Sequence, residues 1–275
     1  VGEIGGCGGY DFVGSVELWI LRMSKVALHR YRVPIVNLGT GFEGYRILQW
    51  SDLHLGRPCP VEDALDRVRD LPVDLVVLTG DVLHSADFVE EGRAFLEVLT
   101  ANLSPRDGFV AVLGNHDSGA VGLGEGEGGI RWLNNDLMRL ERGDDRLNVV
   151  GLDQRCWAAT DVCAAFRGVE GREPTVVLGH FPLTAALVGD LADVVLSGHT
   201  HGGQIRVPGL PFFTNDHLGW RHGRGLTRVG GVSLVVSAGL GYSGPFSFRF
   251  FSKPELVLVE LASEGGRTAA EEELT

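Results

Sequence analysis

The feature that constrains the fold most is a set of short, mostly apolar runs, each followed by Gly or by Ser-Gly and then by Asp, Asn or His. The runs are residues 74–79, 109–113, 175–178 and 193–196. Continuous apolar runs of this length are typical of parallel strands that are buried on both faces. Helical spacing predicts one helix before the first run, at residues 61–71, and one between the first two runs, at residues 88–103. The alternation predicts an α/β fold of layered sheets with helices outside.

Shorter patterns predict the remaining elements. Residues 130–140 have helical spacing and are predicted to form a helix, and residues 160–166 a shorter one. Strands are predicted at 26–36, 46–50, 147–152, 206–207, 226–229, 233–237 and 255–261. One domain is therefore expected over residues 26–262, with an N-terminal tail at 1–25 and an acidic C-terminal tail at 263–275.

The charge balance and the cysteines limit the partners and the compartment. Lys and Arg number 24 against 36 Asp and Glu, so the net charge is −12. A broad nucleic-acid-binding surface is excluded, because such surfaces need clustered basic residues, whereas a small anionic substrate fits if a metal supplies positive charge. No run of about 18 apolar residues marks a transmembrane segment, and the four cysteines form no C-x-x-C pair. The prediction is a cytoplasmic protein, with peripheral membrane association left open.

Metal-binding side chains follow five predicted strands at the point where each strand ends. They are Asp52, His54, Asp81, Asn115, His180, His199 and His201. Ligands of α/β sheets bind at the carboxyl ends of the strands, so these side chains are expected to meet. Asp52 and His54 are two residues apart, and in an extended segment both would point to one side. Carboxylate, imidazole and amide ligands suit Mn, Fe or Zn, and the set is large enough for two ions bridged by Asp81.

Together these motifs resemble the calcineurin-like metallophosphoesterase family over about residues 26–261. The motifs are Asp52-x-His54, Gly80-Asp81, Gly114-Asn115-His116-Asp117, Gly179-His180 and Gly198-His199-x-His201. Four further segments are similar to a bacterial branch of phosphodiesterases, the YaeI/YkuE-like proteins. These segments are residues 51–56, 198–204, 236–241 and 254–258.

The resemblance implies a four-layer α/β/β/α sandwich of the metallo-dependent phosphatase type with a binuclear metal centre. The implied ions are divalent or of mixed valence, Mn or Fe, with Zn as an alternative. Their implied ligands form one set for each ion and a shared bridge: Asp52, His54 and His201; Asn115, His180 and His199; and Asp81. His116 would contact the substrate phosphate and protonate the leaving group, with Asp117 orienting it. The implied reaction is hydrolysis of a phosphate ester, in particular a diester, by a hydroxide that bridges the metals.

Some residues depart from the family pattern or fall outside it. Many family members have a carboxylate three residues after the bridging Asp, where this chain has His84, so the surroundings of the metals are expected to differ there. Arg221, His222 and Arg224 lie in a Gly-flanked loop that either binds a substrate phosphate or is simply solvated. Alternating Phe in residues 245–251 predict a core-facing strand rather than a lipid-contact surface.

Other functions remain compatible with the sequence. One is hydrolysis of a UDP-diacylglucosamine pyrophosphate in lipid A synthesis, a lipid-linked substrate whose acyl chains would lie along the Phe-rich segments. A second is a phosphomonoesterase, which includes the protein phosphatases. The third is a non-catalytic scaffold that keeps the fold to bind a partner. Scaffolds of that kind usually lose metal ligands, whereas this chain has all seven.

Overall fold

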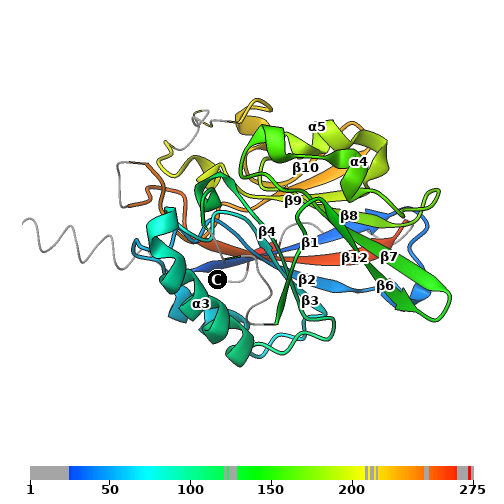
Figure 1. Cartoon of the computed structure of the whole chain (residues 1–275), viewed down its shortest axis with the longest axis horizontal. Coiled ribbons are helices and arrows are strands. Elements are labelled where there is room, and N and C mark those ends of the chain that lie inside the picture. The colour runs from blue at the N-terminus through cyan, green and yellow to red at the C-terminus, as the bar shows by residue number, and fades with distance from the viewer. Residues whose placement is uncertain are drawn as a thin grey trace, which may run out of the picture.

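Two stacked β-sheets with helices on their outer faces make up the structure (Figure 1). It is a computed structural model that describes residues 25–120, 123, 129–207, 210, 214, 216–244, 248–264 and 272–273. The expected tail at 1–25 lies almost entirely outside the described residues, so it stays a prediction. Of the expected C-terminal tail at 263–275, residues 263–264 and 272–273 are described: Ser263 ends a strand, and Glu272 and Glu273 pair with the first strand.

The first sheet contains seven strands within the described ranges. In spatial order they are β13 (Glu272–Glu273), β1 (Ala27–Ile35), β12 (Glu255–Ser263), β2 (Arg46–Trp50), β3 (Leu75–Thr79), β4 (Phe109–Val112) and β5 (Ile130–Trp132). The strands β2, β3, β4 and β5 are mutually parallel, so the loops that follow β2, β3 and β4 leave the sheet on the same side. This arrangement matches the prediction that the buried runs are parallel strands.

The second sheet contains six strands in the described part of the chain. In spatial order they are β10 (Gly225–Val229), β11 (Val232–Val236), β9 (Val194–Ser197), β8 (Thr175–Leu178), β7 (Asp145–Gly151) and β6 (Asp136–Arg142). The strands β7, β8, β9 and β11 are parallel, and the two outer strands pair antiparallel.

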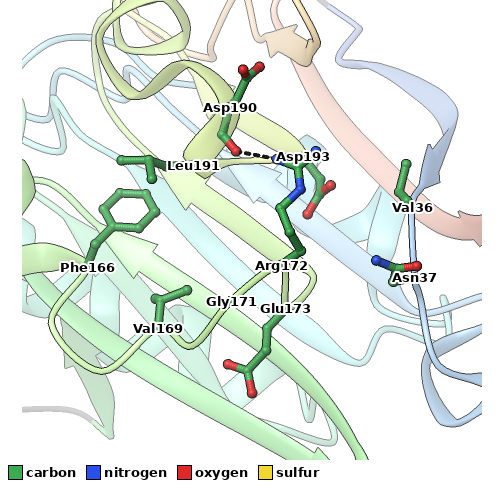
Figure 2. A pocket seen from close by; sticks show the side chains of 10 residues that line it. All are labelled: Val36, Asn37, Phe166, Val169, Gly171, Arg172, Glu173, Asp190, Leu191 and Asp193. Carbon is green, nitrogen blue, oxygen red and sulfur yellow. Dashed lines mark hydrogen bonds between the residues drawn. The ribbon is translucent and has the colours of Figure 1, made fainter.

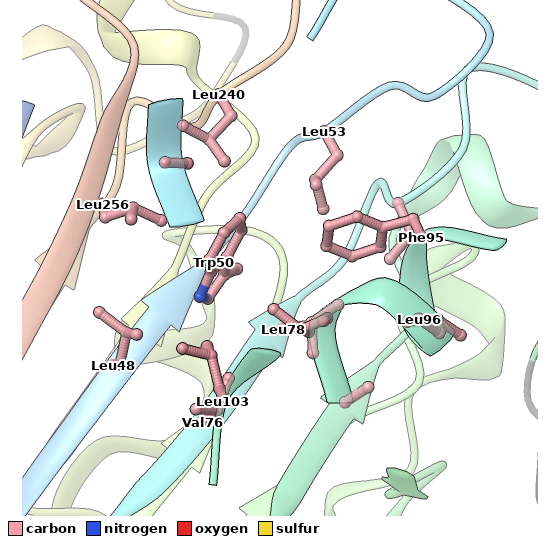
Figure 3. Close-up of a cluster of buried hydrophobic side chains, with 14 of the residues drawn as sticks. Leu48, Trp50, Leu53, Val76, Leu78, Phe95, Leu96, Leu103, Leu240 and Leu256 are labelled. Atoms are coloured by element: carbon pink, nitrogen blue, oxygen red, sulfur yellow. The ribbon is translucent and has the colours of Figure 1, made fainter. Parts of the chain in front are cut away.

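In the part of the chain that the structure describes, three hydrophobic cores separate four layers. Helices α2 (Val61–Val68) and α3 (Val89–Asn102) cover the first sheet, and Figure 3 shows Trp50 of β2 facing Phe95 of α3, with ring centroids 5.9 Å apart. A second core fills the space between the sheets. A third core lies between the second sheet and the short helices α4 (Val162–Ala165) and α5 (Thr184–Val188). The predicted four-layer α/β/β/α sandwich is therefore confirmed.

The predicted helix at residues 130–140 is wrong. This segment forms β5 and then β6, joined by a turn in which Asn135 adopts a left-handed backbone with φ of 57°. Along β6 the buried residues Met138 and Leu140 alternate with more exposed ones, which is the period of a strand with one buried face. Pairing of β6 with β7 across the turn at Gly143 outweighs the local helical spacing.

The predictions for the chain beyond β9 also need correction. Residues 206–207 form no strand, and next to them Ile205 makes one isolated bridge with Phe250. The predicted core-facing strand at 245–251 is contradicted where it is described, since Phe250 is 39% and Phe251 49% exposed. Phe246 lies outside the described residues. In the described ranges, no helix combines the length and the apolar character needed to cross a membrane.

Candidate metal centre

The seven predicted ligands lie in loops at the carboxyl ends of strands from both sheets. Asp52 and His54 follow β2, Asp81 follows β3, and Asn115 begins the 3₁₀ turn η3 (Asn115–Asp117) after β4. The loops after β8 and β9 bring His180, His199 and His201 from the second sheet. The stacking of the two β-sheets thus brings together side chains that are far apart in the sequence.

The first group of converging side chains is Asp52, His54 and His201. One donor atom of each lies within 4.8 Å of the others, and all three residues are buried. The Nε2 atoms of His54 and His201 are 3.0 Å apart, and Nε2 of His201 is 3.5 Å from Oδ1 of Asp52. Such close approach of two imidazoles and a carboxylate suits a divalent cation between them.

The second group is Asp81, His180 and His199, whose donor atoms also converge within 4.8 Å. Nε2 of His180 is 3.2 Å from Oδ2 of Asp81 and 3.3 Å from Nδ1 of His199. Oδ2 of Asp81 is also 3.6 Å from Nε2 of His54 in the first group, so this one carboxylate reaches both groups. Nearby, Oδ1 of Asn115 is buried without a hydrogen-bond partner among the described residues, as expected for an unused ligand atom. The residues therefore fit a pair of metal ions.

The backbone turns these side chains inward, and the predicted extended conformation is wrong. Five of the seven have left-handed backbone with φ between 48° and 70°: Asp52, His54, Asp81, His199 and His201. A left-handed residue other than Gly costs about 1–3 kcal/mol and persists only where the surroundings impose it, typically at functional sites. The strained backbone conformations thus occur at residues that are predicted from the sequence to be metal ligands.

Comparison with known proteins agrees with this geometry. Residues 45–203 match the family model described as calcineurin-like phosphoesterase. This range contains most of the strands and all seven proposed metal ligands. The chain belongs to the calcineurin-like phosphoesterase family. This phosphoesterase is accordingly a metal-dependent hydrolase of phosphoesters, and the predicted family is confirmed.

Individual relatives cover most of the phosphoesterase. It is 27% identical to the uncharacterized metallophosphoesterase YkuE of Bacillus subtilis, over 93% of this chain and 91% of the relative. It is 30% identical to phosphodiesterase YaeI of Escherichia coli, over 79% of this chain and 82% of the relative. It is 26% identical to the UDP-2,3-diacylglucosamine pyrophosphatase LpxG of Chlamydia muridarum, over 80% of this chain and 84% of the relative. The predicted resemblance to the YaeI/YkuE branch is confirmed.

The protonation of the phosphoesterase site follows from burial and from the charges inside it. Burial lowers the pKa of His54 and of His199 to about 3, so both are neutral as ligands must be. Burial would also lower the pKa of His180, but the Asp81 carboxylate outweighs it and raises that pKa to about 9. Burial raises the pKa of Asp52 to about 6. In the metal-free protein, a proton on His180 therefore balances the charge of Asp81.

We predict that metal binding releases a proton from His180. Since its pKa lies near 9, His180 is protonated at pH 7 and must lose that proton to become a ligand. Affinity for Mn²⁺ or Zn²⁺ should therefore rise about tenfold per pH unit from pH 7 towards pH 9. Titration calorimetry of chelator-treated protein in two buffers of different ionisation enthalpy measures the proton count. Equal apparent enthalpies in both buffers would contradict the prediction.

The His116 side chain lies beside the two groups. Its backbone N–H donates to Oδ1 of Asp81 at 2.8 Å, and its ring meets the ring of His54 with centroids 4.7 Å apart. Nδ1 of His116 is 2.9 Å from the carbonyl oxygen of His84. A carbonyl can only accept, so Nδ1 carries the proton and Nε2 is the atom left for proton exchange.

Asp117 does not take the predicted position behind the His116 ring. Its carboxylate is fully buried and accepts from the backbone N–H groups of Leu83 and Gly114, each at 2.9 Å. The carbonyl of His84 holds the ring in its place. Asp117 thus fixes the turn that carries Asn115 and His116, and it acts on the site through the backbone.

Asp52 is held by a tightly packed glycine. A Cβ atom on Gly198 would overlap the carboxylate of Asp52 and the hydroxyl of Ser51. Ser51 donates to Asp52 at 2.6 Å, and the backbone N–H of His199 donates to the same carboxylate at 3.0 Å. The absence of a side chain at position 198 therefore lets the loop after β9 close onto the loop after β2.

We predict that Gly198→Ala lowers metal content and activity together. The added methyl group displaces Asp52, and small misplacements in an active site commonly cost about 10²-fold in rate. Metal analysis and turnover of the purified variant measure both effects. Gly231→Ala, in the exposed turn between β10 and β11, is the matched control and should leave both unchanged. Normal metal content in Gly198→Ala would show that the loop accommodates the methyl group.

The loop with Arg221, His222 and Arg224 has mostly structural contacts. The Arg224 guanidinium donates to the buried carboxylate of Glu255, Arg221 lies over the Trp220 ring at 5.5 Å, and Nδ1 of His222 is 3.2 Å from the hydroxyl of Thr227. Arg224 is therefore part of a partly buried ion pair. Substrate binding by this loop stays a prediction.

Sequence reasoning missed Arg249. Its guanidinium donates to the carbonyl of Gly241 at 2.6 Å and lies 3.2 Å from Nδ1 of His201. Burial lowers the pKa of Arg249 to about 10, and the remaining positive charge helps to keep His201 neutral. The sequence offered one signal for Arg249, which is the single charged residue inside the Phe-rich segment 245–251.

A cavity of about 420 Å³ is lined by residues that belong to neither metal group (Figure 2). Its walls include Arg172, Glu173 and Asp193, which precede β8 and β9, and Arg172 donates to the backbone oxygen of Asp190 at 2.8 Å. These residues mark the amino ends of the strands whose carboxyl ends carry His180 and His199. The cavity is thus separate from the candidate site.

Proposed function

We propose that this protein hydrolyses phosphate esters, in particular diesters, at two metal ions held by Asp52, His54 and His201 and by Asn115, His180 and His199. The observation that carries the proposal is the position of Asp81, whose Oδ2 atom is 3.2 Å from His180 and 3.6 Å from His54. A single carboxylate between two donor sets is the arrangement expected for bridged ions.

The surroundings of the site support hydrolysis. When bound, two divalent cations would offset the charge of the phosphate and lower the pKa of an attacking water. The burial of Asp52, His54 and His180 limits competing water and strengthens electrostatic attraction to a phosphate. His116 presents Nε2 beside the groups, where it would give a proton to the departing oxygen.

The diester preference rests on the likeness to YaeI, which is named a phosphodiesterase. A second candidate is a lipid-linked pyrophosphate, because LpxG is named a UDP-2,3-diacylglucosamine pyrophosphatase. The exposed apolar residues Ile205, Phe250 and Phe251 favour it as well. Ile205 lies four residues after His201 in the sequence, and it forms a bridge with Phe250. A phosphomonoesterase is the third candidate. A scaffold without activity is disfavoured because all seven ligand positions hold ligand-type residues.

A reconstitution experiment tests these candidates. Chelator-treated protein is loaded separately with Mn²⁺, Fe²⁺, Co²⁺, Ni²⁺ or Zn²⁺. It is then assayed with nitrophenyl phosphate, bis-nitrophenyl phosphate and a detergent-dispersed lipid pyrophosphate. We expect metal-dependent hydrolysis with the diester cleaved fastest. A fastest rate on the lipid would favour the second candidate, and full activity without added or residual metal would contradict the proposal.

A further inference from the structure

An exposed tryptophan stands at the end of a row of aromatic rings that begins at a proposed metal ligand. Trp157, in the 3₁₀ turn η4 (Trp157–Ala159), is 44% exposed. Its ring stacks on that of Phe181, with centroids 4.8 Å apart and an interplanar angle of 20°. The Phe181 ring in turn meets the ring of His199 edge-on, with centroids 4.5 Å apart. The row therefore leads from the second metal group to the surface.

The loop that carries Trp157 is fixed by the side chain of Asn135. Oδ1 of Asn135 accepts from the backbone N–H groups of Asp153 at 3.0 Å and Asp161 at 3.1 Å. Its Nδ2 donates to the carbonyl oxygen of Ala159 at 2.7 Å. One amide thus holds both ends of the loop, so the indole keeps its place without a ligand to order it.

The same loop is tied to the metal groups through Gln154. The fully buried Gln154 side chain accepts from the backbone N–H of Phe181 at 2.8 Å. Its backbone N–H donates to Leu113 at 3.3 Å, two residues before Asn115. These hydrogen bonds therefore fix the position of the loop relative to the two segments that carry His180 and Asn115. Single exposed apolar residues are ordinary on protein surfaces, but Trp157 is connected to the site by the contacts described above.

We propose that Trp157 forms a stacking subsite for a planar aromatic ring of the phosphoester substrate, such as a nucleobase. The inference rests on the proposed function, since it assumes that the phosphate lies at the metal groups. One face of the indole packs on Phe181, and the exposed side chain offers its surface to a ligand ring. Stacking on an aromatic side chain contributes about 1–3 kcal/mol per base and tolerates any base. The subsite therefore selects phosphoesters that carry a planar aromatic ring, and it does not discriminate between bases.

Two probes that differ only in the base test the subsite. Adenosine monophosphate and ribose phosphate share the phosphate and the sugar, and calorimetry on the metal-loaded protein measures Kd for each. The wild-type protein should bind the nucleotide about 5- to 150-fold more tightly. Trp157→Ala should abolish this difference without changing Kd for ribose phosphate, and Trp157→Phe should restore part of it. Leu187→Ala, an exposed apolar residue of α5, is the control that keeps the wild-type ratio.

Other results would overturn the inference. Equal affinity of the wild-type protein for both probes would exclude a stacking subsite, and so would an equal loss of both affinities in Trp157→Ala. Hydrolysis of bis-nitrophenyl phosphate by the same preparations separates this failure from failure of the proposed function. Metal-dependent hydrolysis without a base preference refutes the subsite alone. A base preference lost in Trp157→Ala, together with absence of hydrolysis, refutes the proposed function and leaves the subsite standing.

Discussion

Replacing Asp81 with Asn is expected to reduce phosphoesterase activity by roughly a thousandfold or more and to lower metal content at both groups. Asp81 is the carboxylate whose Oδ2 approaches both His180 and His54. An amide in its place removes the negative charge shared by the two proposed ions, and the electrostatic contribution of such ions is several kcal/mol. The loss should therefore exceed that from any ligand serving one ion.

The Asn substitution is chosen to separate charge from structure. Its oxygen can still accept from the backbone N–H of His116, which donates to Oδ1 of Asp81 in the wild-type protein. Elemental analysis and turnover of the purified variant are the measurements, with circular dichroism to show that it is folded. Asp87→Asn, an exposed carboxylate in the turn η2 (Ala86–Phe88), is the matched control. Two ions per chain with near-normal turnover in Asp81→Asn would remove the bridging role.

The strands and the position of the site could be predicted from the sequence because both depend on local patterns. Strands buried on both faces must be continuously apolar, so β3, β4, β8 and β9 are visible as runs. Parallel strands place their carboxyl ends together, so the polar residues after each run meet at one rim. The four-layer detail came from the family resemblance, since the runs alone do not assign strands to one sheet or two.

The strands β5 and β6, which lie in different sheets, could not be predicted, because the interactions that decide them are not local. Residues 130–140 fit a helix by spacing, and the strand forms because Met138 and Leu140 pack against the core between the sheets. The turn depends on Asn135, whose side chain is engaged by the distant loop at 153–161. Neither contact can be deduced from the spacing of apolar residues within residues 130–140.

The supporting residues of the site were also beyond reach of sequence patterns. Arg249 contacts His201, and Gln154 and Trp157 contact Phe181, but no spacing in the sequence links these three residues to the ligand motifs. The family resemblance implies that Asp117 orients the ring of His116. The turn η3 directs the Asp117 carboxylate to backbone N–H groups instead. Neighbouring side chains in a tight turn point in different directions, so the motif alone does not fix which groups the Asp117 carboxylate contacts.

Substitution of His116 by Ala is expected to slow hydrolysis of an ester with a poor leaving group by about 10²–10⁴-fold, because general acid catalysis typically contributes this much. Metal content should stay unchanged. The contact that His116 makes with Asp81 uses its backbone N–H, which alanine keeps. The ring itself is absent from the two proposed ligand sets, so its removal should leave both ions in place. Metal analysis beside turnover checks both parts, with His217→Ala, an exposed histidine, as the control.

The choice of leaving group shows what the His116 ring contributes. Because Nδ1 donates to the carbonyl of His84, a transferable proton would sit on Nε2. Nitrophenolate departs without much need for a proton, so His116→Ala should lose little with a nitrophenyl ester and most with an alkyl ester of poor leaving ability. Rates for a matched nitrophenyl and alkyl diester, measured on wild-type and variant protein, give the two ratios. Equal losses for both esters would mean that His116 stabilises charge on the phosphate and gives no proton to the departing oxygen.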